Sequence, residues 1–487
     1  MLRKIRIIFA LLFFVGITLL FLDFTGVVSL YLGWMAKVQL LPAVMALNVG
    51  VIVALVLLTF FFGRFYCSVV CPLGVTQDFF AWIGSRVKKN RYRYHRPLTW
   101  LRWVVTGLFV VAMVAGLNAV AVLIAPYSAY GRMVSSIGQP VYIWFNNLLA
   151  GIAERHESYA FYSVEMRAVS AVTLVTASVT LVVVAALSLW RGRLWCNTIC
   201  PVGTVLGFVS RWSLMKPVID HSKCTGCHRC EHNCKAECIN SANRTIDYSR
   251  CVGCMDCIGK CSGGAIKYRF CGLKLKEKNA EVDSSRRKFL VASAAVGTAM
   301  ALQAQEENID GGLAVIEDKV KPTRKTPLKP AGSYGLNHFA KHCTSCQLCV
   351  AECPNHLLHP SKELRTLMQP EMSFHDGYCR PGCVKCSQVC PTGAIKSISA
   401  EEKSSISIGY AVVVPQNCLS AKGDKCGHCA EVCPVEAVTM VADAATGFET
   451  PAVDENRCLG CGKCEYLCPA RPLSAIYVEG REQHGRV

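Results

Sequence analysis

The sequence predicts an α-helical membrane domain, with four transmembrane helices and a candidate fifth helix, joined to small α+β domains rich in cysteine. Hydrophobic residues make up 52% of the 487-residue chain, and long apolar segments fill its first 190 residues. The chain contains 30 cysteines, and all but two follow residue 190. The net charge is +18, but the basic residues collect in loops beside the apolar segments. We therefore expect no nucleic-acid partner.

Four apolar segments are long enough to cross a bilayer, which takes about 20 residues. They run over residues 7–30, 41–62, 103–125 and 168–190. Basic residues precede the first segment, fill the loop after the second and follow the fourth, whereas Glu154, Glu157 and Glu165 lie in another loop. The positive-inside rule then places both ends of this unit, residues 1–215, in the cytoplasm and the aromatic-rich loop 126–167 outside. We expect a multi-pass protein of the bacterial inner (cytoplasmic) membrane.

The second and fourth segments end in one repeated motif, "GRFYCSVVCPLG" and "GRLWCNTICPVG". Such a repeat predicts two related helical hairpins. The i, i+4 spacing places Cys67 with Cys71, and Cys196 with Cys200, on one helix face. These four thiols form the candidate catalytic site at the cytoplasmic interface. They could serve as a redox site, a metal site or the lining of a quinone pocket, and the sequence leaves all three open.

Residues 216–275 are predicted to form a cytoplasmic ferredoxin-like domain. Its segments "CTGCHRCEHNC" and "CVGCMDCIGKC" both have the spacing C-x2-C-x2-C-x3-C, in which the fourth cysteine ligates the other of two [4Fe-4S] clusters. The predicted ligand sets are Cys224, Cys227, Cys230 with Cys261, and Cys251, Cys254, Cys257 with Cys234. The doubled pattern disfavours zinc, and it disfavours haem at the C-x2-C-H of Cys224–His228. Cys238 and Cys271 remain as ordinary buried thiols.

The segment "DSSRRKFLVASAAVGTAM", residues 283–300, lies in the middle of the chain, and the predicted signal or anchor runs over residues 284–305. Its S-R-R-K-F-L stretch fits the twin-arginine export motif, and a plain anchor helix is the alternative. Residues 306–335 contain Pro322, Pro327 and Pro330 and are predicted to be an extended linker. Residues 336–487 then form the last predicted domain.

That last domain carries four further cysteine quartets, each ending in Cys-Pro. They are Cys343, Cys346, Cys349, Cys353; Cys379, Cys383, Cys386, Cys390; Cys418, Cys426, Cys429, Cys433; and Cys458, Cys461, Cys464, Cys468. They predict four periplasmic [4Fe-4S] clusters with exchanged fourth ligands. Nested exchange (first with fourth, second with third) and sequential exchange both satisfy the count, and we favour the nested order. With the two cytoplasmic clusters, the cofactors are six clusters held by twenty-four cysteine metal ligands.

Two resemblances follow from these motifs. Residues 1–271, with four spans, two C-x3-C-P motifs and a two-cluster domain, resemble the NapH-type membrane ferredoxins of periplasmic nitrate reductase systems. Residues 284–475, with the twin-arginine signal, the stretch "LKPAGS" and four quartets, resemble the NapG/MauM-type ferredoxins. The resemblance implies a quinol dehydrogenase component that passes electrons from the membrane quinone pool to a periplasmic reductase, such as nitrate reductase, or to cytochrome c. We expect quinol to be oxidised near Cys67, Cys71, Cys196 and Cys200. Further membrane subunits are candidate partners.

Two other functions fit the composition less well. An accessory factor that reduces or delivers metal during assembly of a respiratory oxidase or reductase would use the C-x3-C-P thiols, but six clusters exceed that need and there is no Met/His-rich copper tract. A redox-sensing regulator would need a sensory or DNA-binding domain, and the sequence suggests none. Outer-sphere electron transfer requires no acid–base constellation, so the sequence does not decide whether the chain is itself an enzyme. It also leaves open whether the fused halves are separated near Ala301 or Ala304.

Overall fold

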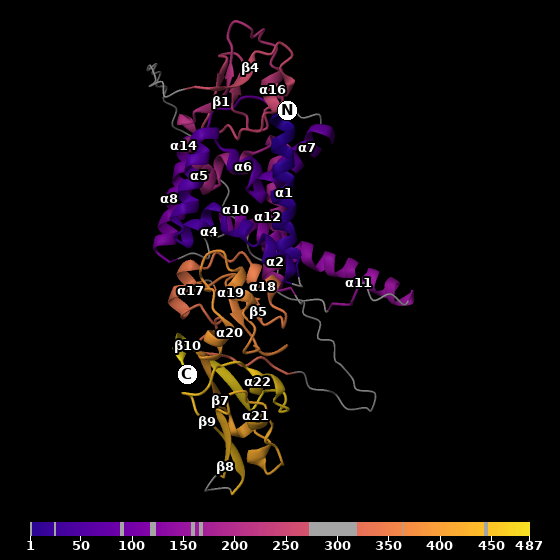
Figure 1. Cartoon of the computed structure of the whole chain (residues 1–487), viewed down its shortest axis with the longest axis vertical. Helices are drawn as coiled ribbons and strands as arrows, with labels where there is room; N and C mark the ends of the chain where they lie inside the picture. The colour runs from indigo at the N-terminus through magenta and orange to yellow at the C-terminus, as the bar shows by residue number, and fades with distance from the viewer. Residues whose placement is uncertain are drawn as a thin grey trace, which may run out of the picture.

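A computed structural model of the chain describes residues 2–23, 26–87, 92–116, 123–156, 161–164, 169–271, 319–363, 365–442 and 447–487. The predicted twin-arginine segment, residues 284–305, lies outside these residues, as does the first part of the predicted linker. The described parts form a column, with helices in the middle and one small cysteine-rich body at each end (Figure 1). We call these the inner body (residues 213–271) and the outer body (residues 319–487).

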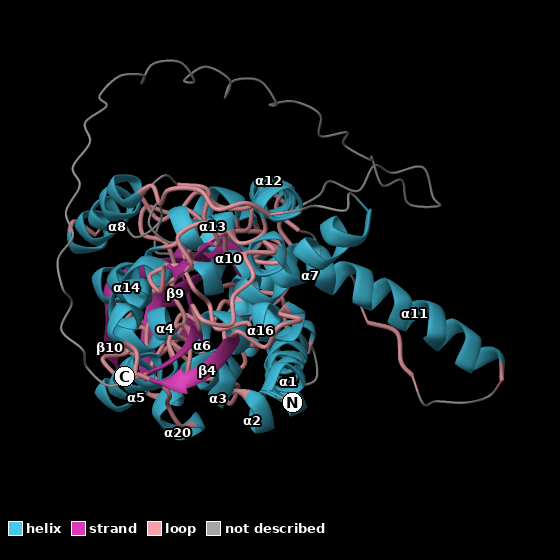
Figure 2. Ribbon diagram, turned by 90° about the horizontal axis from the view of Figure 1, so that it is seen from above, coloured by secondary structure: helices cyan, strands magenta, loops and turns pink. Residues whose placement is uncertain are grey.

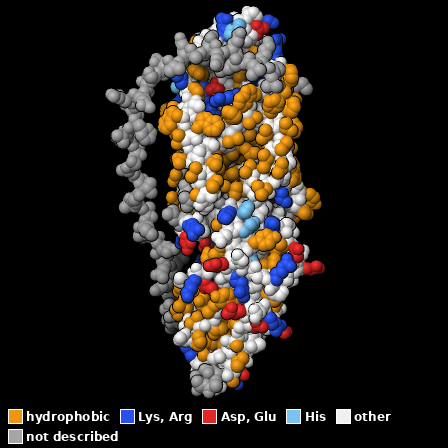
Figure 3. All heavy atoms as spheres, turned by 90° about the vertical axis from the view of Figure 1, so that its left-hand side faces the viewer, with side chains coloured by type: hydrophobic (Ala, Val, Ile, Leu, Met, Phe, Trp, Pro, Cys, Tyr) orange, Lys and Arg blue, Asp and Glu red, His pale blue; other side chains and the backbone are white. Residues whose placement is uncertain are grey.

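The helical unit contains long helices that run along the column and short ones that pack among them (Figure 1). Its elements are α1 (Leu2–Leu22), α2 (Val27–Leu32), α3 (Trp34–Lys37), α4 (Leu40–Met45), α5 (Val49–Phe62), α6 (Phe65–Val69), α7 (Pro72–Val87), α8 (Thr99–Val114), α10 (Pro126–Met133), the π-helical turn η1 (Val134–Gly138), α11 (Gln139–Arg155), α12 (Ala171–Arg191), α13 (Leu194–Thr198), α14 (Pro201–Val209) and the 3-10 turn η2 (Ser210–Trp212). On the face that Figure 3 shows, apolar side chains cover this unit, and charged side chains gather beyond both of its ends.

Two described helices, α1 and α12, are long and apolar enough to cross a membrane. Helices α5 and α8 lie where the second and third spans were predicted, but they are shorter apolar helices of 14 and 16 residues. The four-span architecture therefore stays a prediction. Figure 2 shows that α11 projects sideways from the column.

The predicted boundaries of the first two spans are wrong, and polar side chains explain both differences. The segment 7–30 divides because α1 ends at Leu22 and the Asp23 carboxylate accepts a hydrogen bond from the Val28 backbone N–H at 2.9 Å. The segment 41–62 divides into α4 and α5 because the Asn48 side chain caps the new helix, accepting from the Val51 N–H at 3.3 Å. Such side-chain oxygens satisfy the first free N–H groups of a helix.

The inner body is a small α+β unit. It contains β1 (Met215–Ile219), α15 (Arg229–His232), β2 (Ile239–Asn240), β3 (Thr245–Ile246), α16 (Asp256–Lys260) and β4 (Ile266–Phe270). The antiparallel pair β1–β4 runs from Met215↔Phe270 to Ile219↔Ile266, so the two ends of the body meet next to the helical unit. The second pair, β2–β3, is a short hairpin.

A buried carboxylate joins the inner body to the helical unit. Asp78 on α7 accepts hydrogen bonds from Arg193 Nε at 2.6 Å and Arg6 Nη1 at 3.1 Å, and it forms an ion pair with Lys235 Nζ at 2.9 Å. These cations come from the segment after α12, from α1 and from the inner body. Because a buried charge is costly unless it is paired, this site constrains how the three segments meet.

The outer body is a longer α+β unit. It contains α17 (Leu336–His342), α18 (Leu348–Glu352), β5 (Leu358–Pro360), β6 (Pro370–Met372), α19 (Lys385–Val389), α20 (Ala400–Ser404), β7 (Ile406–Val413), the 3-10 turns η3 (Pro415–Asn417) and η4 (Ser420–Lys422), α21 (His428–Glu431), β8 (Val438–Ala442), β9 (Glu449–Val453), α22 (Lys463–Leu467) and β10 (Ile476–Arg486). The antiparallel pairs are β5–β6, β7–β10 and β8–β9. The long strand β10 connects the last quartet back to β7, and thereby holds the body together.

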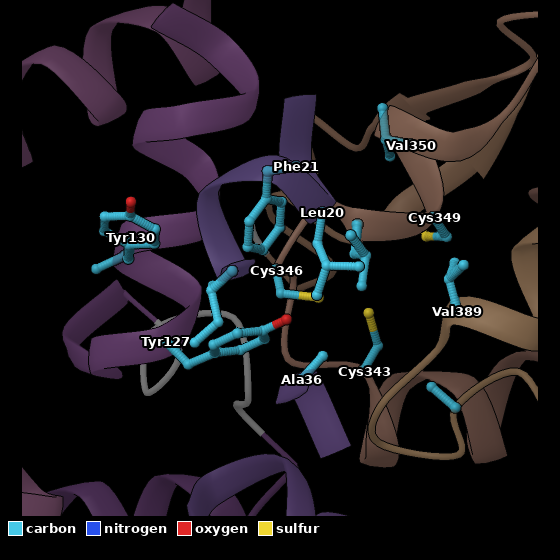
Figure 4. Close-up of a cluster of buried hydrophobic side chains, with 14 of the residues drawn as sticks. Leu20, Phe21, Ala36, Tyr127, Tyr130, Cys343, Cys346, Cys349, Val350 and Val389 are labelled. Atoms are coloured by element: carbon cyan, nitrogen blue, oxygen red, sulfur yellow. The ribbon is translucent and has the colours of Figure 1, made fainter. Parts of the chain in front are cut away.

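The outer body packs directly on the helical unit. Phe21 and Tyr127 lie beside Cys346 in one continuous apolar core (Figure 4). An added Cβ at Gly131 on α10 would lie 2.5 Å from the Cys346 carbonyl oxygen and 2.7 Å from the Phe21 ring. The contact therefore requires a glycine at this position.

We predict that Gly131→Ala weakens this contact by about 1–3 kcal/mol, the usual cost of overpacking. Hydrogen–deuterium exchange of residues 343–353 should increase, and the thermal midpoint should fall. Gly151→Ala on α11 is the matched control, since an added Cβ there meets nothing within 4 Å. Equal exchange in the two variants would contradict the contact.

Candidate iron–sulfur cluster sites

The inner body has two hollows lined by cysteines. Cys224, Cys227, Cys230 and Cys261 surround the first, and Cys234, Cys251, Cys254 and Cys257 surround the second. These are the ligand sets that the spacing predicts. In both sets the fourth cysteine comes from the other quartet, as α15 and α16 pack against each other. The second hollow lies toward the helical unit, because Gly253 approaches the Phe62 carbonyl oxygen.

The outer body exchanges its fourth cysteines between neighbouring quartets. Three cysteines of each quartet lie together with the last cysteine of its neighbour: Cys343, Cys346, Cys349 with Cys390; Cys379, Cys383, Cys386 with Cys353; Cys418, Cys426, Cys429 with Cys468; and Cys458, Cys461, Cys464 with Cys433. We name these outer sites one, two, three and four in that order. The nested order that we favoured from sequence is therefore wrong. Helix α18 packs on α19, and α21 on α22, so each fourth cysteine reaches the adjacent quartet.

The turn between the second and third cysteine has a recurring shape. The residue after the second cysteine has a positive φ at His228 (57°), Met255 (63°), Gln347 (68°) and Gly462 (77°). A left-handed residue bends the chain sharply, and here it wraps the chain around the hollow before a short helix begins. The two quartets with a longer first gap lack this conformation. The regular C-x2-C-x2-C spacing and the left-handed turn thus occur together.

The cysteine sulfurs accept hydrogen bonds from nearby donors. Backbone N–H groups donate to Cys343, Cys390, Cys433 and Cys468 at 3.3–3.4 Å. Lys403 Nζ lies 3.2 Å from Cys379 Sγ, and sequence spacing gave no sign of this partner. Such donors stabilise negative charge on sulfur and tune the reduction potential of a cluster.

The donor sets fit [4Fe-4S] clusters. Burial raises the pKa of Cys343 and that of Cys346 to about 12, so a bound cation is needed to hold both as thiolates at neutral pH. Iron supplies that charge, and a bound cluster carries one electron at a time between neighbouring sites. Within the described ranges, no group of three or more His, Cys, Asp or Glu side chains is placed to hold a single metal ion.

The four cysteines of the helical unit come together as well. Cys67, Cys71, Cys196 and Cys200 are each 3% exposed and lie close to one another. We call them the thiol tetrad. Gln77 Nε2 donates to Cys196 Sγ at 3.1 Å, and the Gly203 N–H donates to Cys200 Sγ at 3.3 Å. The tetrad is enclosed by protein on all sides.

Two buried arginines cross-link the repeated hairpins. Arg64 of the first repeat donates to the Cys196 carbonyl oxygen at 3.1 Å, and Arg193 of the second donates to the Cys67 carbonyl oxygen at 2.7 Å. An added Cβ at Gly74 or at Gly203 would lie 2.1–2.2 Å from one of these carbonyl oxygens. The arginine and the final glycine of the repeated motif therefore build the tetrad, a role that the sequence did not reveal.

The tetrad connects toward both cluster bodies. Arg64 Nη2 lies 3.9 Å from Cys67 Sγ, and its Nη1 donates to the Ser249 carbonyl of the inner body at 3.1 Å. On the other side, Tyr66 and Tyr127 belong to the same buried core, and Tyr127 is close to Cys346. The Tyr127 hydroxyl is buried, has no hydrogen-bond partner among the described residues, and points toward outer site one (Figure 4).

Contacts in the outer body set the order of its sites. Outer site one lies against the helical unit, and outer site two shares α18 and α19 with it. The Cys379 N–H donates to the Cys461 carbonyl oxygen at 2.9 Å, which joins site two to site four. Site three follows, since Cys429 lies near Cys464. The sites thus form a line that leads away from the helical unit.

Cys238 is more than a spare thiol. Its sulfur lies 3.5 Å from Cys234 Sγ, and it lines the same hollow in the inner body. It is thus a second candidate for the fourth ligand at that site. Cys271 is half-buried at the end of β4 and lines neither inner hollow.

Comparisons with known proteins agree with iron–sulfur chemistry. A family model described as a 4Fe-4S binding domain matches residues 44–91 and 173–219, the two segments that contain the C-x3-C-P motifs. A model described as a 4Fe-4S dicluster domain matches residues 342–420 and 422–471. The first match extends the iron–sulfur description to the region of the tetrad. The second covers most of the outer body and all four of its quartets.

Curated relatives resemble part of the chain. The ferredoxin-type protein NapG of Escherichia coli is 32% identical over 214 residues, which is 39% of this chain and 84% of NapG. The methylamine utilization ferredoxin-type protein MauM of Methylophilus methylotrophus is 32% identical over 193 residues, 36% of this chain and 84% of MauM. MauM of Methylobacillus flagellatus is 31% identical over 166 residues, 32% and 70% of the two chains. No solved structure matches the chain.

Sequential exchange makes a prediction about thiol reactivity. In Cys353→Ala, alkylation mapped by mass spectrometry should label Cys379, Cys383 and Cys386, because their cluster loses its fourth ligand. The control Cys390→Ala should instead expose Cys343, Cys346 and Cys349. Labelling of Cys458, Cys461 and Cys464 in the Cys353 variant would restore the nested order.

The unpartnered Tyr127 hydroxyl allows a prediction about the reduction potential of an outer cluster. A donor near a cluster stabilises its reduced, more negative state. Tyr127→Phe should therefore lower the potential of one outer cluster by about 60 mV, the one-electron equivalent of about 1.4 kcal/mol for one hydrogen bond. An EPR-monitored redox titration measures this shift. Tyr130→Phe is the control, since its hydroxyl lies 2.6 Å from Thr18 Oγ1, and an equal shift there would refute a specific bond.

Proposed function

We propose that this chain, which belongs to the family of ferredoxin-type proteins that includes NapG and MauM, carries electrons from membrane quinol to a periplasmic reductase. Iron–sulfur electron transfer itself is what the family and the matched domains indicate. The finer proposal concerns the donor, the acceptor and the direction. It includes a NapH-like helical unit that acts as the quinol dehydrogenase component, with nitrate reductase as one candidate acceptor.

One observation carries the proposal: the two cysteine-rich bodies lie at opposite ends of an apolar helical unit (Figures 1 and 3), and the tetrad, Tyr66 and Tyr127 belong to the core that connects that unit to the outer body. A protein that exchanged electrons only between soluble partners would need no such unit. Quinol is the electron carrier that dissolves in a bilayer, so an apolar unit fits it. The line of outer sites then leads electrons away from the membrane.

The proposed location follows from the same arrangement. If the helical unit spans the inner membrane, the two bodies lie in different compartments, with the inner body in the cytoplasm and the outer body in the periplasm. Cluster insertion occurs in the cytoplasm, so the outer body would have to cross the membrane already folded. The predicted twin-arginine segment at residues 284–305 would serve that export, and its place between the two bodies suits the role.

We predict that quinol reduces the clusters of the full chain in lipid nanodiscs. Addition of decylubiquinol or menadiol should produce EPR signals of reduced [4Fe-4S] clusters, and dithionite provides the complete signal for comparison. If both quinols leave every cluster oxidised while dithionite reduces them, the proposed donor is wrong.

The tetrad is proposed as the redox link between the two cluster sets. Its place between Arg64, which is next to the inner body, and Tyr66, which belongs to the same apolar core as Tyr127, supports this role. In the double variant Cys67→Ser/Cys196→Ser, electron transfer between the outer and the inner clusters after addition of quinol should therefore slow by at least about tenfold. EPR after rapid freezing separates the two sets.

Cys271→Ser is the control for that variant, because Cys271 belongs to no ligand set. Unchanged reduction of the inner clusters in the double variant would remove the tetrad from the electron path. The iron content of the same protein also tests its chemistry. A loss of iron relative to Cys271→Ser would mean that the tetrad holds iron, as the matched family model suggests.

A further inference from the structure

A cavity of about 250 Å³ lies where the helical unit meets the inner body. One wall is the loop 95–98 before α8, a second comes from the segment 191–198 at the end of α12, and the third is Ala236, Glu237 and Arg250 of the inner body. One water occupies about 30 Å³ in the liquid, so the cavity is large enough for a phosphate group with a small polar substituent.

Hydrogen bonds hold the walls of the cavity in place. The Tyr94 N–H donates to Glu231 Oε1 at 2.9 Å, which fastens the loop before α8 to the inner body. Asn197 Nδ2 donates to the Ala236 carbonyl oxygen at 3.2 Å, which fastens the inner body to α13. The cavity is thus built by three segments that meet only in the folded chain.

The side chains that line the cavity carry an excess of positive charge. Glu237 is the one acidic side chain among its described lining residues, and two bases already contact it. Arg191 donates to Glu237 through Nε at 3.1 Å and Nη2 at 2.6 Å, and His95 Nδ1 lies 3.1 Å from Glu237 Oε2. Arg191 Nη1 and the whole guanidinium of Arg96 have no hydrogen-bond or ion-pair partner among the described residues. These free donors suit an anionic group.

Two buried arginines of the cavity wall add to the positive potential. Arg193 is 0% exposed and shares Asp78 with two other cations, and Arg250 is 5% exposed and pairs with Asp247 at 2.8 Å. Each of the two arginines has a buried Nη2 without a hydrogen-bond partner among the described residues. Because charges interact strongly through a poorly solvated wall, an anion in the cavity is stabilised by both arginines without touching them.

The surface around the cavity is apolar. Leu98 and Leu194 belong to its lining, and α13 packs against both α8 and α12 beside it (Figure 2). The exposed Trp100 lies at the start of α8, and the exposed Trp190 lies at the end of α12 with the Arg191 guanidinium 5.7 Å from its ring centre. Tryptophan is enriched at the depth of lipid headgroups, so a ligand with a charged head and an apolar tail fits this position.

We propose that this cavity binds the headgroup of an anionic phospholipid, with phosphate oxygens accepting from Arg96 and from Arg191 Nη1. The acyl chains lie along the exposed apolar side chains of α8 and α12. Basic pockets at the cytoplasmic surface of a membrane suit such headgroups. The bound lipid contacts the loop before α8, the end of α12 and the inner body, and therefore stabilises the contact between the two units. This inference rests on the proposed membrane location and is independent of the proposed electron path.

Titration of the full chain with phosphatidylglycerol in neutral detergent tests the site, since no charged lipid surface is present there. Native mass spectrometry should show one phosphatidylglycerol bound at least about tenfold more tightly than phosphatidylcholine. Arg96→Gln removes a free donor, and Thr198→Trp fills the cavity from α13. Each should weaken phosphatidylglycerol binding at least about tenfold, as expected for loss of a charge-assisted hydrogen bond or of the space for the headgroup.

Arg93→Gln is the matched control, because it removes the same charge from an exposed position that precedes the cavity loop and lies outside the cavity lining. It should bind phosphatidylglycerol as the unchanged protein does. The EPR signal after reduction by dithionite verifies that every variant retains its clusters. If Arg93→Gln loses as much affinity as Arg96→Gln, or if neither Arg96→Gln nor Thr198→Trp loses any, the attraction is general and the cavity is not the site.

Hydrogen–deuterium exchange supplies an independent readout. Phosphatidylglycerol should slow exchange in residues 92–98 and 235–237 of the unchanged protein and of Arg93→Gln, but not of Arg96→Gln. If inorganic phosphate or glycerol phosphate gives the same protection, the ligand is a soluble phosphate and the lipid proposal is wrong. Equal binding of phosphatidylcholine also overturns the site, although the membrane location stands. If the chain stays soluble without detergent and retains no lipid, the membrane location itself fails.

Discussion

The exchange of the fourth cysteine between neighbouring quartets is the constraint on which the rest of the structure depends. Three closely spaced cysteines can reach only three irons of one cluster, so a second quartet must pack against the first before either site is complete. In the outer body this requirement pairs the quartets on α18 and α19, and those on α21 and α22. Each pair becomes one compact half, and the hydrogen bond from Cys379 to Cys461 joins the halves. The line of sites follows from these local pairings.

The two repeats of the helical unit also complete each other, but through hydrogen bonds from arginine and not through cluster ligands. Each repeat contributes one pair of cysteines and one arginine, and each arginine hydrogen-bonds to the other repeat. Neither hairpin can satisfy its own buried groups, since the carbonyl oxygens of Cys67 and Cys196 need a donor from across the interface. The tetrad is therefore as much a product of exchange between repeats as the cluster sites are.

Spacing predicted much of this chemistry because it reports local geometry. The ligand sets of the inner body lie together as the C-x2-C-x2-C-x3-C pattern implies, and the repeat placed the tetrad cysteines at equivalent positions. Partners distant in sequence could not be predicted in this way. Nested and sequential exchange leave the same spacing, so only packing decides between them. No local signal pointed to Tyr127 as a site residue, because Tyr127 meets Cys346 only when the outer body packs on the helical unit.

The contact between the outer body and the helical unit brings outer site one next to the helical unit. Without it, outer site one would face solvent, and the Tyr127 hydroxyl would have nothing to approach. With it, the same small surface brings together the end of α1, the base of α11 and the cluster helix α18. A substrate that diffuses within a bilayer and a cluster that belongs to a water-exposed body can meet only at such a boundary.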